Sequence, residues 1–132
     1  MKDQIDIRIY YEDTDCGGVV YYGKYLTYLE RARTTYLEST GISLAQLMAQ
    51  GILFTVVNVE IKYHSPAKYG DIITILSKIV KITPASITFE HKIIRKETDI
   101  LISTSLVKLA CVDRNMKILR LKDKLGALFE TT

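Results

Sequence analysis

Three acidic residues lie close together near the start of the chain, and two glycines follow them. Glu12, Asp13 and Asp15 fall within four residues, ahead of Gly17 and Gly18, in the segment YYEDTDCGGVVYYGKYLTYLERAR. A carboxylate can act as a base or a nucleophile toward a carbonyl carbon, and free backbone N–H groups at a helix start can stabilise the negative charge that develops on the oxygen. The glycines let a ligand approach the loop without a Cβ in the way. The same residue types also favour an ordinary solvated turn, which is the competing interpretation.

A calcium site is a further interpretation of the same loop, and the spacing argues against it. In EF-hand order, Asp13, Asp15 and Gly18 would take positions 1, 3 and 6. Position 5 would then be Gly17, and position 12 would be Lys24 where a bidentate glutamate is needed. We therefore expect no metal site, and nothing else in the sequence implies a metal or redox cofactor.

Length and composition describe one ordinary globular domain spanning residues 1–132. Apolar residues make up 48% of the chain and charged residues 25%, which is typical of a globular protein. The net charge of +3 is too small for a nucleic-acid-binding surface, which needs basic residues clustered on one face. Cys16 and Cys111 show no paired spacing and fit a reducing compartment. Because the sequence has no signal-peptide core and no apolar run of about 18 residues, we expect a cytoplasmic protein with no membrane span.

Hydrophobic periodicity predicts a long helix directly after the acidic loop. From position 24 onward, apolar residues recur at the spacing of one helix face, at Tyr25, Leu29, Ala32 and Tyr36. Gly41 is a typical helix stop, and a shorter amphipathic helix is expected between Ser43 as N-cap and Gly51 as stop. Glu30 and Arg33 lie three residues apart and mostly off the apolar stripe, where they would either form a surface or interface ion pair or take a catalytic role.

Alternating segments rich in β-branched residues fill most of the remaining chain. A short strand is predicted before the acidic loop at residues 6–11, four long strands at residues 52–64, 71–83, 85–97 and 100–113, and a closing helix at residues 122–130. The order of one strand, one long helix and then four strands in a meander predicts an α+β fold, with one antiparallel sheet and the helix on one face. Such a sheet leaves an edge strand open, so we expect at least a dimer.

Two motifs carry a family resemblance that spans most of the chain. The first has the form Y-x-x-D-T-D-x-x-G-V-V-Y-x-x-x-Y-(L/F)-x-(Y/F)-x-E-x-A-R and is matched by Tyr10, Asp13, Thr14, Asp15, Gly18, Val19, Val20, Tyr21, Tyr25, Leu26, Tyr28, Glu30, Ala32 and Arg33. The second, Y-x-x-P-A-x-x-G-D, is present as YHSPAKYGD at residues 63–71. In both motifs the sequence resembles the 4-hydroxybenzoyl-CoA thioesterase family, and within it the YbgC-like acyl-CoA thioesterases.

The resemblance implies a fold, a reaction and an assembly. The family has the hotdog fold, in which an antiparallel sheet wraps around one long central helix. Its members are usually homodimers or homotetramers with active sites at the dimer interface. The implied reaction is hydrolysis of an acyl-CoA thioester to a free acid and CoA, without a cofactor.

The family's functional residues carry over onto the acidic loop and the start of the long helix. Its catalytic aspartate aligns with Asp15, which would act as base or nucleophile. Its oxyanion donor, a backbone N–H, aligns with Tyr22, where many YbgC-like enzymes have a histidine and the 4-hydroxybenzoyl-CoA branch has an aromatic residue. Glu12 and Asp13 would shape the loop. The residues expected to contact the substrate are Gly17, Gly18, Val19, Tyr21, Tyr25, His64 and Ser65.

Other polar residues are open to more than one interpretation. His91 lies in the middle of a predicted strand and is expected to be structural. Lys92, Arg95 and Lys96 lie toward a strand end, where they would either hold CoA phosphates or form a solvated basic patch. Cys16 has no histidine near it in sequence, which argues against a nucleophilic thiolate.

Two rival functions remain on the same fold. A hotdog hydratase or dehydratase typically places a histidine close to its catalytic acid, whereas His64 and His91 are far from Asp15 in sequence and on different elements. A non-catalytic acyl-CoA-binding module is the other alternative, and the presence of Asp15 argues against it. An assay for release of the thiol distinguishes hydrolysis from both.

Overall fold

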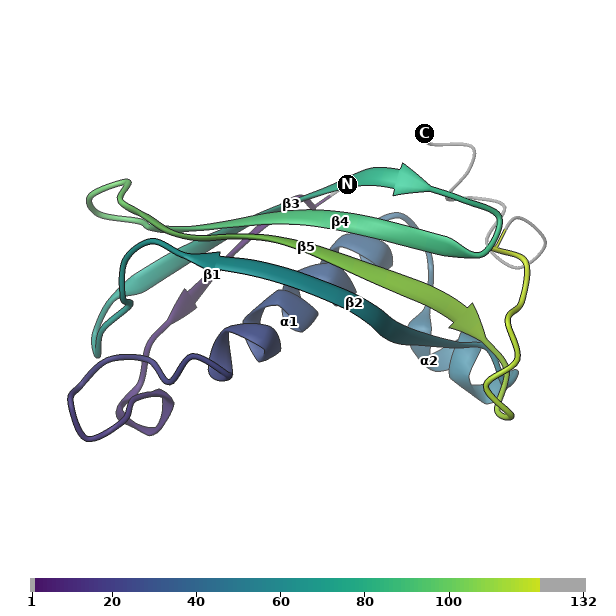
Figure 1. Ribbon diagram of the computed structural model, residues 1–132, viewed down its shortest axis with the longest axis horizontal. Helices are drawn as coiled ribbons and strands as arrows, with labels where there is room; N and C mark the ends of the chain where they lie inside the picture. The colour runs from purple at the N-terminus through teal and green to yellow at the C-terminus, as the bar shows by residue number, and fades with distance from the viewer. Residues whose placement is uncertain (1, 122–132) are drawn as a thin grey trace.

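A five-stranded antiparallel sheet curves over one long helix (Figure 1). The computed structural model describes residues 2–121, in which the sheet order is β1-β3-β4-β5-β2. The strands are β1 (Gln4–Arg8), β2 (Leu53–Tyr63), β3 (Ile72–Ile82), β4 (Ser86–Arg95) and β5 (Leu101–Val112). The helices are α1 (Lys24–Ser39) and α2 (Leu44–Ala49), with a single 3₁₀ turn at Tyr11–Asp13. The predicted α+β class, with a sheet wrapped around one long helix, is confirmed.

Helix α1 forms where it was predicted because its apolar stripe faces the sheet. The four stripe residues Tyr25, Leu29, Ala32 and Tyr36 are all buried. They pack against inward-facing side chains of the central strands, among them Ile73, Phe89 and Val107. Gly41, at a φ of +95°, lets the chain turn out of α1. The Ser43 hydroxyl accepts a hydrogen bond from the N–H of Gln46 at 3.2 Å, which caps α2 as predicted.

The order of the strands differs from the predicted meander. Strands β3, β4 and β5 do follow one another, but β2 pairs with β5 at one edge and β1 pairs with β3 at the other. The connection from β2 to β3 therefore crosses three strand spacings, roughly 14 Å at about 4.8 Å each. Residues 64–71 are long enough to do so at about 3.4 Å per residue. Pro66 has no N–H and so cannot extend the β2 ladder.

Strand β1 ends earlier than the predicted segment 6–11. It stops at Arg8, and the following residues form the 3₁₀ turn. The carboxylate of Asp13 accepts a hydrogen bond from the N–H of Tyr10 at 2.9 Å. The N–H of Tyr10 is thereby bonded to a side chain, whereas in a longer strand it would donate to a neighbouring strand.

The boundaries of the four long strands match the predicted segments to within two residues at each end. The predicted closing helix at residues 122–130 lies outside the described residues, and the single domain spanning residues 1–132 stays a prediction. No helix between residues 2 and 121 is both long enough and apolar enough to cross a membrane.

Candidate active site

The acidic loop is a tight hairpin that presents Asp15 near its tip. The N–H of Asp15 donates to the carbonyl of Val19 at 2.9 Å, and the N–H of Gly18 donates back to the carbonyl of Asp15 at 3.1 Å. Gly18 has a φ of +77°, a conformation that favours glycine and makes the turn possible. The N–H of Gly17 donates to Oδ1 of Asp15 at 2.8 Å. The Asp15 carboxylate is therefore oriented by the loop backbone while remaining exposed.

Asp13, two residues earlier, has a structural role. Its side chain is buried, and besides the bond from Tyr10 its Oδ1 lies 3.4 Å from Nζ of Lys24. Burial, together with the nearby Asp13 carboxylate, raises the pKa of the Tyr28 hydroxyl. The expectation that Asp13 shapes the loop is confirmed by these contacts. Since the Asp13 carboxylate is buried and already engaged, Asp15 is the better placed of these two aspartates to meet a ligand.

The start of α1 offers two backbone donors beside this loop. Within residues 2–121, neither the N–H of Tyr22 nor that of Gly23 donates a hydrogen bond to the protein. The peptide that joins them is oriented from the sheet, because the hydroxyl of Tyr63 donates to the carbonyl of Tyr22 at 3.1 Å. Free N–H groups at the first turn of a helix favour negative charge on an approaching oxygen.

The β2–β3 connection holds the hairpin, the helix and the sheet together. Ala67 accepts a hydrogen bond from the N–H of Val20 at 2.8 Å, and its own N–H donates to the hydroxyl of Tyr25 at 3.1 Å. At the end of the connection, Asp71 forms an ion pair with Arg95 at 3.0 Å. The second sequence motif therefore supports the first one, since its residues fix the position of the acidic loop and of α1.

Four of the residues predicted from the sequence line one pocket at this junction. The pocket has a volume of about 280 Å³, and its walls are Val20, Tyr22, Tyr25, Tyr63, His64, Ser65 and Pro66. All four were expected at the site, namely Tyr22, Tyr25, His64 and Ser65. The first two lie at the start of α1, and the other two directly follow the end of β2. Nε2 of His64 lies 3.1 Å from the hydroxyl of Thr104, so one nitrogen of this ring already has a partner.

The other predicted residues are not among those that line this pocket. Gly17, Gly18 and Val19 form the hairpin described above. The ring of Tyr21 lies 4.6 Å from the ring of Tyr22, and both rings are more than half exposed. Tyr25 is nearly inaccessible and its hydroxyl is occupied by Ala67, so it can contribute only a wall.

The sequence that builds this junction matches a known protein family. The thioesterase superfamily model matches residues 17–102, which include the hairpin glycines, α1 and the β2–β3 connection. An acyl-CoA thioesterase, YbgC, from Haemophilus influenzae is 39% identical over 108 residues, covering 81% of this chain and 78% of that protein.

The chain belongs to the thioesterase superfamily.

Two further thioesterases extend the likeness over nearly the whole chain. The long-chain acyl-CoA thioesterase FadM from Escherichia coli is 31% identical over 131 residues, covering 98% of this chain and 97% of that protein. The solved structure of a DHNA-CoA thioesterase from Staphylococcus aureus superposes with a TM-score of 0.91 at 26% identity, covering 97% of this chain and 86% of that one. The predicted family, the hotdog fold and the enzyme class of thioester hydrolase are confirmed.

Sequence reasoning missed the contacts that Tyr63 makes at this candidate site. Its hydroxyl holds the Tyr22 carbonyl, and its ring packs against that of Tyr25 at 5.3 Å. Partial desolvation raises the pKa of the Tyr63 hydroxyl. The available signal was the position of Tyr63 as the first residue of the second motif.

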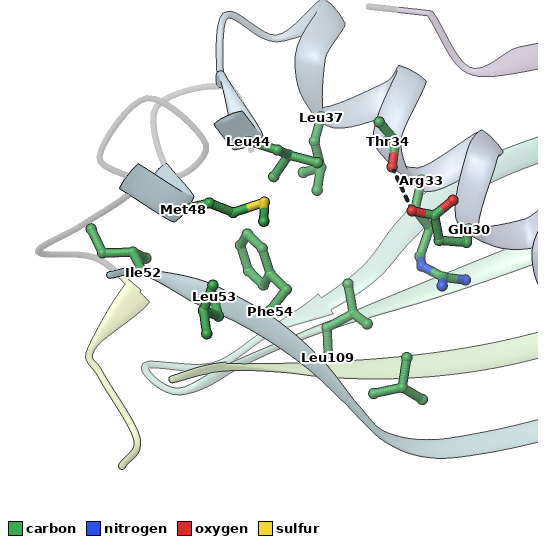
Figure 2. Close-up of a pocket in the computed structure, with 11 residues that line it drawn as sticks. Glu30, Arg33, Thr34, Leu37, Leu44, Met48, Ile52, Leu53, Phe54 and Leu109 are labelled. Atoms are coloured by element: carbon green, nitrogen blue, oxygen red, sulfur yellow. Dashed lines mark hydrogen bonds between the residues drawn. The ribbon is translucent and has the colours of Figure 1, made fainter. Parts of the chain in front are cut away.

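The predicted ion pair between Glu30 and Arg33 is absent within the described chain. Arg33 lies four residues after Leu29 on the buried side of α1 and is only 7% exposed, whereas Glu30 is exposed and accepts a hydrogen bond from Thr34 at 3.3 Å. Figure 2 shows the Arg33 guanidinium reaching from α1 toward the sheet, with the Glu30 carboxylate turned to Thr34. The surface half of the earlier interpretation is wrong because this side of the helix faces the sheet.

Two of the three residues in the predicted basic patch at Lys92, Arg95 and Lys96 form ion pairs with carboxylates of the same chain. Arg95 pairs with Asp71, and Nζ of Lys96 lies 2.6 Å from Oδ2 of Asp6. These contacts favour a structural role for both residues over binding of CoA phosphates. His91 is also structural, because it is fully buried with Nδ1 at 2.9 Å from the Ser77 hydroxyl.

Proposed function

We propose that this protein hydrolyses an acyl-CoA thioester to a free carboxylic acid and CoA, with Asp15 as the working carboxylate. The observation that carries the proposal is the pairing of an exposed carboxylate, held by the N–H of Gly17, with two free backbone donors at the start of α1. The names of its relatives support CoA as the leaving group, since both YbgC and FadM are acyl-CoA thioesterases.

The chemistry follows from what each group can supply. Asp15 either removes a proton from water as the oxygen attacks the thioester carbonyl carbon, or attacks that carbon itself to form an anhydride that water then opens. In both routes the carbonyl oxygen becomes negatively charged, and the N–H groups of Tyr22 and Gly23 are placed to donate to it. Collapse breaks the carbon–sulfur bond, and the CoA thiolate takes up a proton. The sum is thioester plus water giving acid plus thiol, without a metal or redox cofactor.

The substrate would approach through the pocket at the helix start. Gly17, Gly18 and Val19 would pass close to the thioester, with Tyr21 at the rim. Tyr25, His64 and Ser65 would line the wall opposite. The tyrosine ring at position 22 is an additional wall, because the proposed contact of this residue is made by its backbone N–H and not by its hydroxyl.

The proposed working form is a homodimer or a homotetramer in the cytoplasm. Strand β2 forms one edge of the sheet, and it exposes Val56, Val57 and Val59 in succession around Asn58. An open apolar edge of this length favours pairing with another chain. The family resemblance points to the same kind of assembly.

The test of the function is release of free thiol from a panel of acyl-CoA thioesters. The panel should contain straight acyl chains of graded length and aryl thioesters, and both CoA and free acid should be quantified with the purified protein. We expect catalytic release of the two products in equal amounts for at least one member. Binding of acyl-CoA without release would instead indicate a binding module, and a changed acyl group with the thioester intact would indicate a hydratase.

A further inference from the structure

Arg33 is a buried cation whose charge is not balanced by any contact within residues 2–121. Its guanidinium donates no hydrogen bond there, and no carboxylate oxygen lies within 4.0 Å of it. Burial lowers the pKa of Arg33, and attraction to the more distant Glu30 carboxylate offsets this only in part. Removing a charge from water is costly unless an ion-pair partner compensates for it. The surroundings of Arg33 therefore favour an anion that comes from outside the chain.

Arg33 lies in an apolar groove that begins near the proposed catalytic centre. Two cavities of about 440 and 340 Å³ both border Glu30, Arg33 and Val56, and so form one groove between α1 and β2. The larger cavity begins at Leu26, in the first turn of α1 and next to the proposed oxyanion donors. The smaller one continues past Arg33 to Phe54, and Figure 2 shows this end of the groove. An acyl chain whose carbonyl oxygen lies at those donors would therefore extend along the groove toward Arg33.

We infer that the acyl group of the substrate ends in a carboxylate, and that Arg33 binds this carboxylate in the groove. The inference rests on the proposed thioesterase function and names its substrate class, the CoA monothioesters of dicarboxylic acids. A guanidinium and a carboxylate can form two parallel hydrogen bonds, which are among the strongest in proteins. Such a pair would neutralise the buried charge, while the methylene groups of the acyl chain contact the apolar walls.

The spacing along α1 limits the length of the acyl group. Gly23 and Arg33 are ten residues apart in the sequence, which corresponds to a rise of about 15 Å along the helix axis. Side chains of a helix tilt back toward its N-terminus, which shortens the distance to the guanidinium. At about 1.2 Å per bond of an extended chain, at most about 12 bonds separate the two ends of the acyl group. We therefore expect dicarboxylic acids of roughly eight to twelve carbons to fit best.

The sheet beside Arg33 contains further buried polar atoms without a partner. Val107 of β5 lines the groove together with Arg33, and Ser105 lies two residues before it on the same face of the strand. Oγ of Ser105 and Nε2 of His91, which pair across β5 and β4, have no hydrogen-bond partner among the described residues. Burial lowers the pKa of His91, and the nearby Arg33 cation lowers it further. A carboxylate at Arg33 would bring acceptor oxygens to this polar region, whereas a terminal methyl group would bring none.

Glu30 is the groove residue that opposes binding of a second carboxylate. It is exposed, and its own carboxylate accepts a hydrogen bond from Thr34 at 3.3 Å, so that Figure 2 shows it turned away from Arg33. Water and salt weaken the repulsion from an exposed charge. Glu30→Gln removes this repulsion, so it should increase the affinity for a carboxylated acyl group by about 1.5-fold to fivefold.

The direct test compares pairs of CoA thioesters that differ only in the terminal group of the acyl chain. Each pair joins the monothioester of a dicarboxylic acid with the thioester of the monocarboxylic acid of the same length, over roughly six to fourteen carbons. For the unmodified protein we expect kcat/KM to favour the dicarboxylic member by about tenfold to a hundredfold at the best length. Arg33→Met should bring this ratio close to one. Arg31→Met makes the same change at an exposed position of α1 outside the groove and should leave the ratio as it is.

A binding measurement separates this inference from the proposed hydrolysis. Thioethers of CoA with alkyl chains, made with and without a terminal carboxylate, cannot be hydrolysed, and calorimetry gives their dissociation constants for the same variants. A protein that hydrolyses none of the thioesters, but binds the carboxylated thioether more tightly through Arg33, would reject the proposed function and support the role of Arg33.

Three results would overturn the inference and leave thioester hydrolysis in place. The first is equal kcat/KM and equal affinity for both members of every pair in the unmodified protein. The second is a preference for the carboxylated member that survives in Arg33→Met. The third is an Arg33→Met protein that loses its oligomeric mass in light scattering and keeps its preference, because Arg33 would then pair with another copy of the chain. If Arg33→Met does not fold, Arg33→Lys replaces it, and the loss of the two-pronged guanidinium should lower the ratio by at least about threefold.

Discussion

Replacing Tyr63 by phenylalanine tests whether the sheet positions the proposed oxyanion donors. The change removes only the hydroxyl that donates to the Tyr22 carbonyl at 3.1 Å and leaves the ring packed on Tyr25. A neutral hydrogen bond contributes about 0.5–1.5 kcal/mol, and because Tyr63 is 46% exposed, water can replace part of it. We therefore expect kcat to fall by roughly threefold to tenfold, with little change in KM.

The assay is steady-state release of thiol from the best acyl-CoA of the panel, with Tyr69→Phe as the matched control. Tyr69 is similarly exposed and near the same loop, and its ring only meets the edge of Tyr11. Direct loss of an oxyanion donor costs about 10²–10³ in kcat. A hundredfold loss in Tyr63→Phe would therefore show that the hydroxyl acts on the substrate itself. An unchanged kcat would show that the Tyr22 peptide is held in place without it.

Substitutions at three further positions distinguish side-chain from backbone roles and the loop from the core. Tyr22→Phe should keep kcat within about tenfold, roughly 1.4 kcal/mol of barrier, and Tyr22→Ala should mainly change KM or chain-length preference; a hundredfold loss of kcat in the folded Phe variant would give the hydroxyl a chemical role. Gly18→Ala places a side chain at a φ of +77°, which should cost about 1 kcal/mol of strain in the hairpin. We expect a clear loss of kcat and only a small decrease in the urea concentration at which half of the protein is unfolded. Burial lowers the pKa of His91 to about 3. Below pH 6.5 the imidazole therefore binds a proton in the unfolded chain but not in the folded one. The free energy of unfolding should then fall by about 1.4 kcal/mol per pH unit as the pH is lowered. Urea unfolding at pH 7 and pH 5 should show a smaller fall for His91→Gln, and an equal fall in both proteins would contradict the neutral buried ring.

Local features of the fold could be predicted because local physics determines them. The apolar stripe of α1, the hydroxyl of Ser43 and the conformational freedom of Gly41 each act within a few residues, and each is found where it was expected. The early end of β1 was missed, although it is also local, because the competition of the Asp13 carboxylate for a backbone donor is not visible in hydrophobic alternation.

The order of the strands could not be predicted in the same way. Alternation specifies which side of a strand is buried and says nothing about its neighbour. Whether β2 pairs with β3 or β5 depends on the path of residues 64–71, which are held by contacts with Val20 and Tyr25 from a distant part of the chain. The burial of Arg33 depends on the same long-range packing, so three-residue spacing alone suggested an ion pair that the single chain does not form.

The motifs predicted the candidate site, and the different surroundings of its two aspartates became visible only in the structure. The sequence places Asp13 and Asp15 two residues apart with no means to rank them except the family resemblance. The structure separates them, since Asp13 is buried with its oxygens engaged and Asp15 is exposed with one backbone donor. Tyr63 entered only when β2 was seen to end beside the start of α1.

The most direct test of the proposed catalysis is the turnover of Asp15→Asn on the best acyl-CoA substrate. The substitution keeps the size of the side chain and removes its charge, and Glu12→Gln changes a neighbouring exposed carboxylate in the same manner. Loss of a group that transfers protons usually lowers kcat by about 10²–10⁴, and we predict that range for Asp15→Asn with the fold and acyl-CoA binding intact. Glu12→Gln should stay within a few fold of the unmodified enzyme. A folded Asp15→Asn protein that retains more than about a tenth of the original kcat would contradict the assignment of Asp15 as the working carboxylate.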